Sequence, residues 1–75
     1  MSNVVDVKGQ TCPIPLIETR KAIRKLNPGD ELEVIGDHHA SKMEIPMAIE
    51  SLGEELMKIE DESDGKTWHI FIRKV

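Results

Sequence analysis

Sulfhydryl and aromatic groups are scarce in this 75-residue chain, and their scarcity excludes several classes of protein. Cys12 is the only cysteine, so an internal disulfide and a dithiol redox centre are both excluded. Tyrosine is absent, and the only aromatics, Trp68 and Phe71, fall on opposite faces of one predicted strand, which makes no stacking platform for nucleic-acid bases. No apolar run approaches the ~20 residues of a membrane span. A lone thiol is therefore the group that stands out.

Positive charge is also in short supply. The chain has 10 basic and 14 acidic residues and a net charge of −4, which argues against general nucleic-acid binding. The two signs are unevenly distributed. Basic residues cluster in the first third: Lys8, Arg20, Lys21, Arg24 and Lys25. Acidic residues crowd the second half: Glu50, Glu54, Glu55, Glu60, Asp61, Glu62 and Asp64. We therefore expect a basic surface near Cys12 and an acidic remainder.

The overall composition indicates one globular domain. Charged residues make up 32% of the chain and hydrophobic residues 39%, which is typical of soluble folded proteins. Met1-Ser2-Asn3 has neither the basic region nor the apolar core of a signal peptide. We expect a single domain over residues 1–75 that is cytoplasmic and monomeric.

Hydrophobic periodicity divides the chain into six elements. The β-branched run 3–7 and the alternating run 31–35 predict strands. Helical periodicity predicts helices over 15–26 and 41–52. A hairpin of two strands, 56–62 and 67–75, surrounds the turn 63–66, where Asp-Gly is a typical turn pair. The expected helical core positions are Leu16, Ala22, Ile23, Leu26, Ile45, Ala48, Ile49 and Leu52.

Turn and capping residues mark the ends of the helices. Asn27-Pro28-Gly29-Asp30 stops the first helix, and Gly53 ends the second. Ser41 and Glu44 match a capping box, in which each side chain satisfies a free backbone N–H of the helix. Pro46 lies where it removes a backbone hydrogen bond, so the second helix either begins nearer Pro46 or is kinked there.

The element order β-α-β-α-β-β predicts the fold class. Right-handed crossovers place both helices on one face of the sheet, and the alternating strands leave the other face to solvent. The result is an α/β (α+β) two-layer sandwich with a four-stranded mixed sheet. The loops after the first two strands then lie at the same sheet edge, which brings Cys12 towards Asp37, His38 and His39.

Cys12 lies at a predicted strand-to-helix turn between Gly9 and Pro15. Proline suits the first turn of a helix, so the thiol falls near the positive end of a helix dipole. Together with the basic helix face, this position favours a reactive thiolate over a buried structural thiol. Because residues before proline avoid helical geometry, Ile14 is expected to be extended and the helix to begin at Pro15.

Four interpretations of this thiol can be weighed from the residues. A hydrolase with a cysteine nucleophile needs a general base, which His38 or His39 could supply, but no oxyanion-hole glycine motif accompanies them. Carriage of sulfur as a persulfide needs one nucleophilic sulfur and a docking surface, and it fits the residues best. The rivals are a regulatory or binding module with a structural cysteine, and a metal site using Cys12 with His38 and His39, although the ligand spacing matches no zinc motif.

The other polar candidates have simpler interpretations. The two neighbouring histidines most simply form a solvated turn, with tuning of the thiol pKa as the alternative. The helix face of Arg20, Lys21, Arg24 and Lys25 could steer an acidic protein partner. We expect His69 to face solvent from the last strand without a special role.

The chain resembles the TusA family, also called SirA-like proteins, over nearly all of its length. The resemblance rests on Asp6, Gly9 and the Cys-Pro-x-Pro run Cys12-Pro13-Ile14-Pro15, followed by Arg20-Lys21, Pro28-Gly29-Asp30, Asp37, Ala40, Ile45-Pro46 and Ile72-Arg73-Lys74. It implies a β-α-β-α-β-β two-layer sandwich and a sulfur carrier. It further implies that Cys12 takes a persulfide from a cysteine desulfurase or rhodanese-like donor and passes it on, as in tRNA thiolation, cofactor biosynthesis or sulfur metabolism.

The chain also departs from parts of the family pattern. Members devoted to tRNA thiolation typically have Asp-Asp-Pro where this chain has Asp37-His38-His39, and an aspartate in place of Glu44. Some relatives carry a second cysteine where this chain has Ile49. These differences leave the pathway open.

The resemblance and the residues together give a predicted site without cofactor or metal. Cys12 is the predicted catalytic residue. The expected supporting residues are Gly9, Pro13, Pro15, Asp37 and His38, and the expected docking residues are Arg20, Lys21 and Arg24. We expect a protein donor and a protein acceptor of sulfur as partners, with no direct nucleic-acid binding and no membrane insertion.

Overall fold

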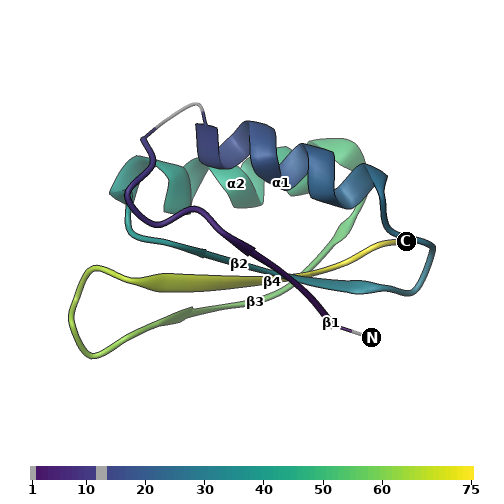
Figure 1. Cartoon of the computed structure of the whole chain (residues 1–75). Helices are drawn as coiled ribbons and strands as arrows, with labels where there is room; N and C mark the ends of the chain where they lie inside the picture. The colour runs from purple at the N-terminus through teal and green to yellow at the C-terminus, as the bar shows by residue number, and fades with distance from the viewer. Residues whose placement is uncertain (1, 12–13) are drawn as a thin grey trace.

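The computed structural model describes residues 2–11 and 14–75, which form two helices on one face of a four-stranded sheet (Figure 1). The elements run β1 (Ser2–Asp6), α1 (Ile14–Arg24), β2 (Glu31–Gly36), α2 (His39–Leu52), β3 (Glu55–Asp61) and β4 (Trp68–Arg73). The sheet order is β1-β2-β4-β3, with β1 parallel to β2 and both other pairs antiparallel. The predicted element order, mixed sheet and two-layer α+β architecture are confirmed. None of the helices in the described ranges is long and apolar enough to cross a membrane.

The core lies between the helices and one face of the sheet. Side chains alternate along β2 and β4, so Leu32 and Val34 pair in register with Ile72 and Ile70 on the buried face. Trp68 completes this layer and is only 1% exposed. The buried apolar core consists of Val7, Ile23, Leu32, Val34, Ile45, Ile49, Trp68, Ile70 and Ile72.

Helix α1 begins one residue earlier than predicted. Ile14 is helical rather than extended, and its backbone N–H donates to the Thr11 carbonyl at 2.9 Å. This turn bond outweighs the preference of a residue before proline for extended geometry. The helix ends at Arg24 instead of Leu26, because the N–H groups of Lys25 and Leu26 bond three residues back and tighten the chain.

The predicted capping box of α2 is wrong. The helix begins at His39 and its N-cap is His38, whose side chain makes no capping bond. Ser41 is already inside the helix and buried, where its hydroxyl meets His38 Nδ1 at 3.1 Å. An N-cap must have non-helical geometry, so a serine at the third helical position cannot act as one.

Helix α2 runs without interruption through Pro46, so the alternative of a start nearer Pro46 is also wrong. Gly53 ends the helix as predicted, with a φ of 78° that suits glycine. Ile45 and Ile49 are buried as expected, but Leu52 is 47% exposed. As the last helical residue, it lines a surface cleft with Arg20 and Arg24 instead of reaching the core.

The β3–β4 hairpin closes over the four residues 63–66. The Glu62 N–H donates to the Thr67 carbonyl at 2.8 Å, and Gly65 takes a φ of 73°. The Asp64 carboxylate accepts bonds from the Thr67 hydroxyl and from the backbone N–H groups of Lys66 and Thr67. These bonds lower the pKa of Asp64 to about 2. The turn predicted at 63–66 is therefore held by an aspartate whose carboxylate accepts hydrogen bonds from residues of the same turn and from Thr67 just after it.

Candidate functional site

The predicted reactive residue, Cys12, and the adjacent Pro13 lie outside the described residues. The described chain on either side is well placed in the fold: residues 7–11 leave β1, and α1 begins at Ile14. The site can therefore be built from its surroundings, which comprise the loop after β1, the loop between β2 and α2, and the first turns of α1.

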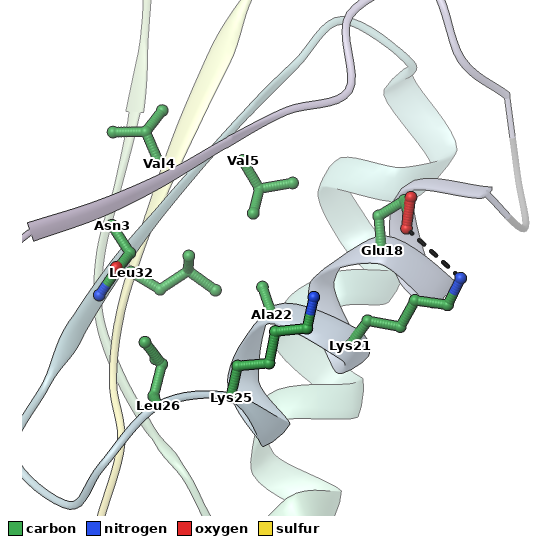
Figure 2. Close-up of a pocket in the computed structure, with 9 residues that line it drawn as sticks. All are labelled: Asn3, Val4, Val5, Glu18, Lys21, Ala22, Lys25, Leu26 and Leu32. Atoms are coloured by element: carbon green, nitrogen blue, oxygen red, sulfur yellow. Dashed lines mark ion pairs between the residues drawn. The ribbon is translucent and has the colours of Figure 1, made fainter.

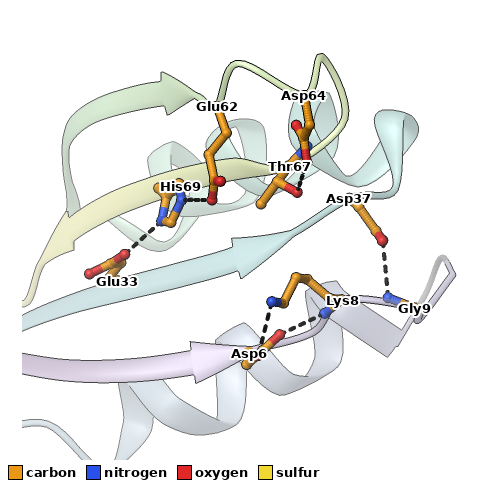
Figure 3. A network of polar contacts seen from close by, with 9 residues as sticks. All are labelled: Asp6, Lys8, Gly9, Glu33, Asp37, Glu62, Asp64, Thr67 and His69. Carbon is orange, nitrogen blue, oxygen red and sulfur yellow. Dashed lines mark hydrogen bonds and ion pairs between the residues drawn. The ribbon is translucent and has the colours of Figure 1, made fainter.

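The loops that follow β1 and β2 are joined to one another, as the predicted topology requires. The Val7 N–H donates to the Ile35 carbonyl at 2.7 Å. Two residues later, the Gly9 N–H donates to Asp37 Oδ1 at 3.0 Å (Figure 3). Gly9 has a φ of 81°, a conformation in which a side chain would be strained. Gly9 and Asp37 thus fix the start of the Cys12 loop against the end of β2.

Lys8 brings a positive charge to the same loop. Its backbone N–H donates to Asp6 Oδ1 at 2.9 Å, and its ammonium group lies 3.8 Å from Asp6 Oδ2 (Figure 3). Both side chains are exposed, so this ion pair is weak and leaves the lysine free to reorient.

His38 is fixed in place by the core. Its carbonyl accepts a bond from the Trp68 indole N–H at 3.1 Å, and its ring meets Ser41. Gly36 is required nearby, because a Cβ at that position would lie 2.5 Å from the Trp68 ring. His39 is exposed, whereas His38 is half-buried, so the two neighbouring histidines differ in environment. Within residues 2–11 and 14–75, no group of three or more His, Asp or Glu side chains could hold a metal ion.

Pro15 serves as a buried anchor at the start of α1. It is inaccessible to solvent, and its carbonyl accepts a bond from the Thr19 hydroxyl at 2.8 Å. Thr19 is fully buried as well. The second proline of the motif therefore anchors the first turn of α1 in the protein interior, immediately after the Cys12 loop.

The predicted docking residues Arg20, Lys21 and Arg24 are all exposed on α1. Arg20 and Arg24 line a cleft of about 330 Å³ together with Ile23, Leu52, Glu54 and Lys74. Glu54 accepts bonds from the Val75 backbone N–H at 2.9 Å and from the Lys74 ammonium at 3.1 Å, and these bonds hold the pKa of Glu54 below its ordinary value. Three cations thus surround one carboxylate that is already satisfied, so this cleft is net positive.

A polar cluster on the opposite sheet face was not foreseen in the sequence. His69 lies half-buried between two carboxylates: Nδ1 is 2.7 Å from Glu33 Oε2, and Nε2 is 2.6 Å from Glu62 Oε2 (Figure 3). The ring also stacks with Phe71, with centroids 6.5 Å apart. The expectation that His69 simply faces solvent is wrong, because Glu33 of β2 and Glu62, which follows the end of β3, lie on either side of its ring.

This cluster predicts a dependence of stability on pH. Hydrogen bonds to Glu62 and Glu33 raise the pKa of His69 above its ordinary value. A raised folded-state pKa stabilises the fold fully below the unfolded value of ~6.5, and that stabilisation is lost as pH rises through the folded pKa. The urea midpoint of the wild type should therefore fall as pH rises above ~6.5, with a smaller fall in His69→Gln. If the urea midpoint fell equally steeply with pH in the wild type and in His69→Gln, the prediction would be contradicted.

Comparisons with known proteins agree with this architecture. The family model for "Sulfurtransferase TusA" matches residues 3–74. A Thermotoga maritima protein named "Putative sulfur carrier protein" is 37% identical over 73 residues, covering 97% of this chain and 91% of the relative. The relative YrkI of Bacillus subtilis bears the same description and is 36% identical over 61 residues, covering 81% of each chain.

A solved structure supports the same assignment. The crystal structure of a SirA-like protein from Desulfitobacterium hafniense matches with a TM-score of 0.84 at 27% identity, covering 97% of this chain and 96% of that one. The family model spans nearly the whole chain, and the fold and the relatives' sequences agree with it. The chain therefore belongs to the TusA sulfurtransferase family.

Proposed function

We propose that this protein carries sulfur as a persulfide on Cys12, taking it from a protein donor and passing it to a protein acceptor. The observation that carries the proposal is the family match over residues 3–74 in a chain with a single cysteine. A carrier of this kind needs one nucleophilic sulfur and no second thiol, and this composition provides just that.

The chemistry needs no external oxidant. The Cys12 thiolate attacks the outer sulfur of a donor persulfide and forms a new S–S bond, while the donor S–S bond breaks and the donor leaves as a thiolate. Unloading repeats the step with an acceptor thiolate as nucleophile. Suitable donors are a cysteine desulfurase or a rhodanese-like protein, and the acceptor belongs to a pathway such as tRNA thiolation, cofactor biosynthesis or sulfur metabolism.

The surroundings of the loop support this role in three ways. Gly9 and Asp37 fix its start, and Pro15 fixes the helix that follows. In the sequence, Cys12 comes two residues before the first residue of α1, and the dipole at a helix N-terminus favours a thiolate over a thiol. The exposed Arg20 and Arg24 offer an acidic donor a docking surface on the same helix.

The direct test is the intact mass of the protein after incubation with a cysteine desulfurase and cysteine, or with a rhodanese-like protein and thiosulfate. The mass should rise by that of one sulfur atom, and dithiothreitol should reverse the rise. If neither donor class adds sulfur to the folded protein, the proposal is wrong.

Charge reversal on α1 should slow loading. In Arg20→Glu or Arg24→Glu, we expect the second-order loading rate to fall roughly tenfold at low salt, because steering by opposite charge acts on the association rate. Lys66→Glu is the matched control: it makes the same change in net charge, but in the hairpin loop. Quenched-flow mass measurements at two salt concentrations would report the rates. If the loading rate fell as much in Lys66→Glu, the net charge of the protein, and not a docking surface on α1, would explain the slower loading.

A further inference from the structure

Strand β1 presents an unpaired backbone edge. In the sheet order β1-β2-β4-β3, its only neighbour among the described residues is β2. The Val7 N–H points to β2, where it donates to Ile35. Backbone groups of a parallel strand point to alternating sides, so the N–H and C=O groups of Val4 and Asp6 point away from β2. These groups are available to pair with another strand.

A cleft of about 340 Å³ lies beside this edge, between β1 and α1 (Figure 2). Its apolar lining comes from both elements and from β2: Val4, Val5, Ala22, Leu26 and Leu32. Alternate side chains of a strand added to β1 would enter this cleft, because successive side chains of a strand point to opposite faces.

The cleft has a positive rim. Lys21 and Lys25 line it from α1, and Figure 2 shows Lys21 reaching to the neighbouring Glu18. That pair is long, at 3.9 Å, and both side chains are largely exposed, so it is easily exchanged for another. Lys25 forms no ion pair with any residue in the described ranges. The charge that would complement this rim is negative.

We propose that the free edge of β1 and the adjoining cleft bind an extended segment of a partner protein in which every second residue faces α1 and these facing residues are in turn apolar and acidic. The backbone of the segment pairs with Val4 and Asp6. On the side of the segment that faces α1, the apolar side chains enter the cleft and the carboxylates between them meet Lys25 and Lys21. A second copy of this chain fits less well, because pairing two β1 edges brings the lysines of both α1 helices together. The proposal does not depend on persulfide chemistry, so it can be tested on Cys12→Ser protein.

The probe is a fluorescent ten-residue peptide that repeats the order valine, threonine, glutamate, threonine, so that valine and glutamate lie on one face of the strand, with a lysine-for-glutamate peptide as its counterpart. We expect the glutamate peptide to bind with amide shifts and slowed hydrogen exchange at Val4 and Asp6. We expect the lysine peptide to bind at least tenfold more weakly, because it meets like charge at the rim. Nuclear magnetic resonance titration and fluorescence anisotropy measure both.

Two pairs of variants separate backbone pairing from charge. Val4→Pro removes an outward N–H without touching the β1–β2 bonds and should weaken binding about tenfold, whereas Val4→Ile keeps the N–H and an apolar side chain and should not. Lys25→Glu should weaken binding about fivefold, whereas Lys66→Glu should not. Retained protection of the Val7 amide shows that β1 still pairs with β2 in each variant.

Several results would overturn the proposal. These are no binding up to millimolar peptide, shifts confined to other surfaces, equal affinity for both peptides, or sedimentation showing that self-association of the chain already covers Val4 and Asp6.

Discussion

Replacing Cys12 with serine is expected to abolish sulfur loading while leaving the fold intact. Cys12 is the only thiol of the chain, so no other side chain can form the S–S bond that loading requires. A serine hydroxyl has nearly the same size, but it is not ionised near neutral pH and forms no persulfide. Intact mass after incubation with donor should show the added sulfur in wild type and none in Cys12→Ser.

The control for this variant is its fold. Circular dichroism and the urea midpoint should match those of the wild type, so that lost loading reports lost chemistry. Equal sulfur uptake by the serine variant would mean that sulfur associates with the protein without the thiol, and the role proposed for Cys12 would fall.

Trp68→Ala should produce the largest loss of stability. Trp68 is 1% exposed at the end of the buried layer, and its indole N–H bonds to the His38 carbonyl. Removing a buried tryptophan costs about 3–5 kcal/mol. That cost rivals the total stability of a domain this size, roughly 4–11 kcal/mol. Urea unfolding followed by circular dichroism should show a variant that is partly unfolded in buffer.

Trp68→Phe tests how the core supports the site. The phenyl ring keeps much of the buried surface but has no N–H, so the His38 carbonyl loses a partner at a cost of about 1–3 kcal/mol. We expect a lower midpoint than wild type, clearly above that of Trp68→Ala, together with amide shifts at Asp37 and His38. If the phenylalanine variant were as unstable as the alanine variant, the hydrogen bond rather than ring burial would dominate.

Periodic patterns predicted the fold well because each one reports which side of an element is buried. The alternation of Trp68, Ile70 and Ile72 placed them in the core, and the helical spacing of Ile45 and Ile49 did the same for α2. Gly53 could be recognised as a helix end because its left-handed conformation suits glycine.

Features that depend on tertiary contacts could not be predicted from the sequence. Ser41 looks like an N-cap from its spacing to Glu44, but α2 begins earlier, at His39. His69 gained its partners from the register between β2 and β4 and from the hairpin loop, neither of which a single strand pattern reveals. Gly36 is explained only by the position of the Trp68 ring.

The candidate site was predicted unevenly for the same reason. The shared edge of the first two loops followed from topology, and the Gly9–Asp37 bond lies there. The burial of Pro15 and its bond from Thr19 did not follow from any local pattern. The roles assigned to Cys12 and to the basic face of α1 stay predictions for experiment.

The most direct measurement of the central claim is cyanolysis of loaded protein after the donor has been removed. Cyanide takes the outer sulfur of a persulfide as thiocyanate and returns the thiolate, with no redox partner needed. The account predicts thiocyanate in an amount equal to that of loaded wild-type protein, and none from Cys12→Ser carried through the same steps. Loaded wild-type protein that yields no thiocyanate, or serine variant that yields as much, would contradict it.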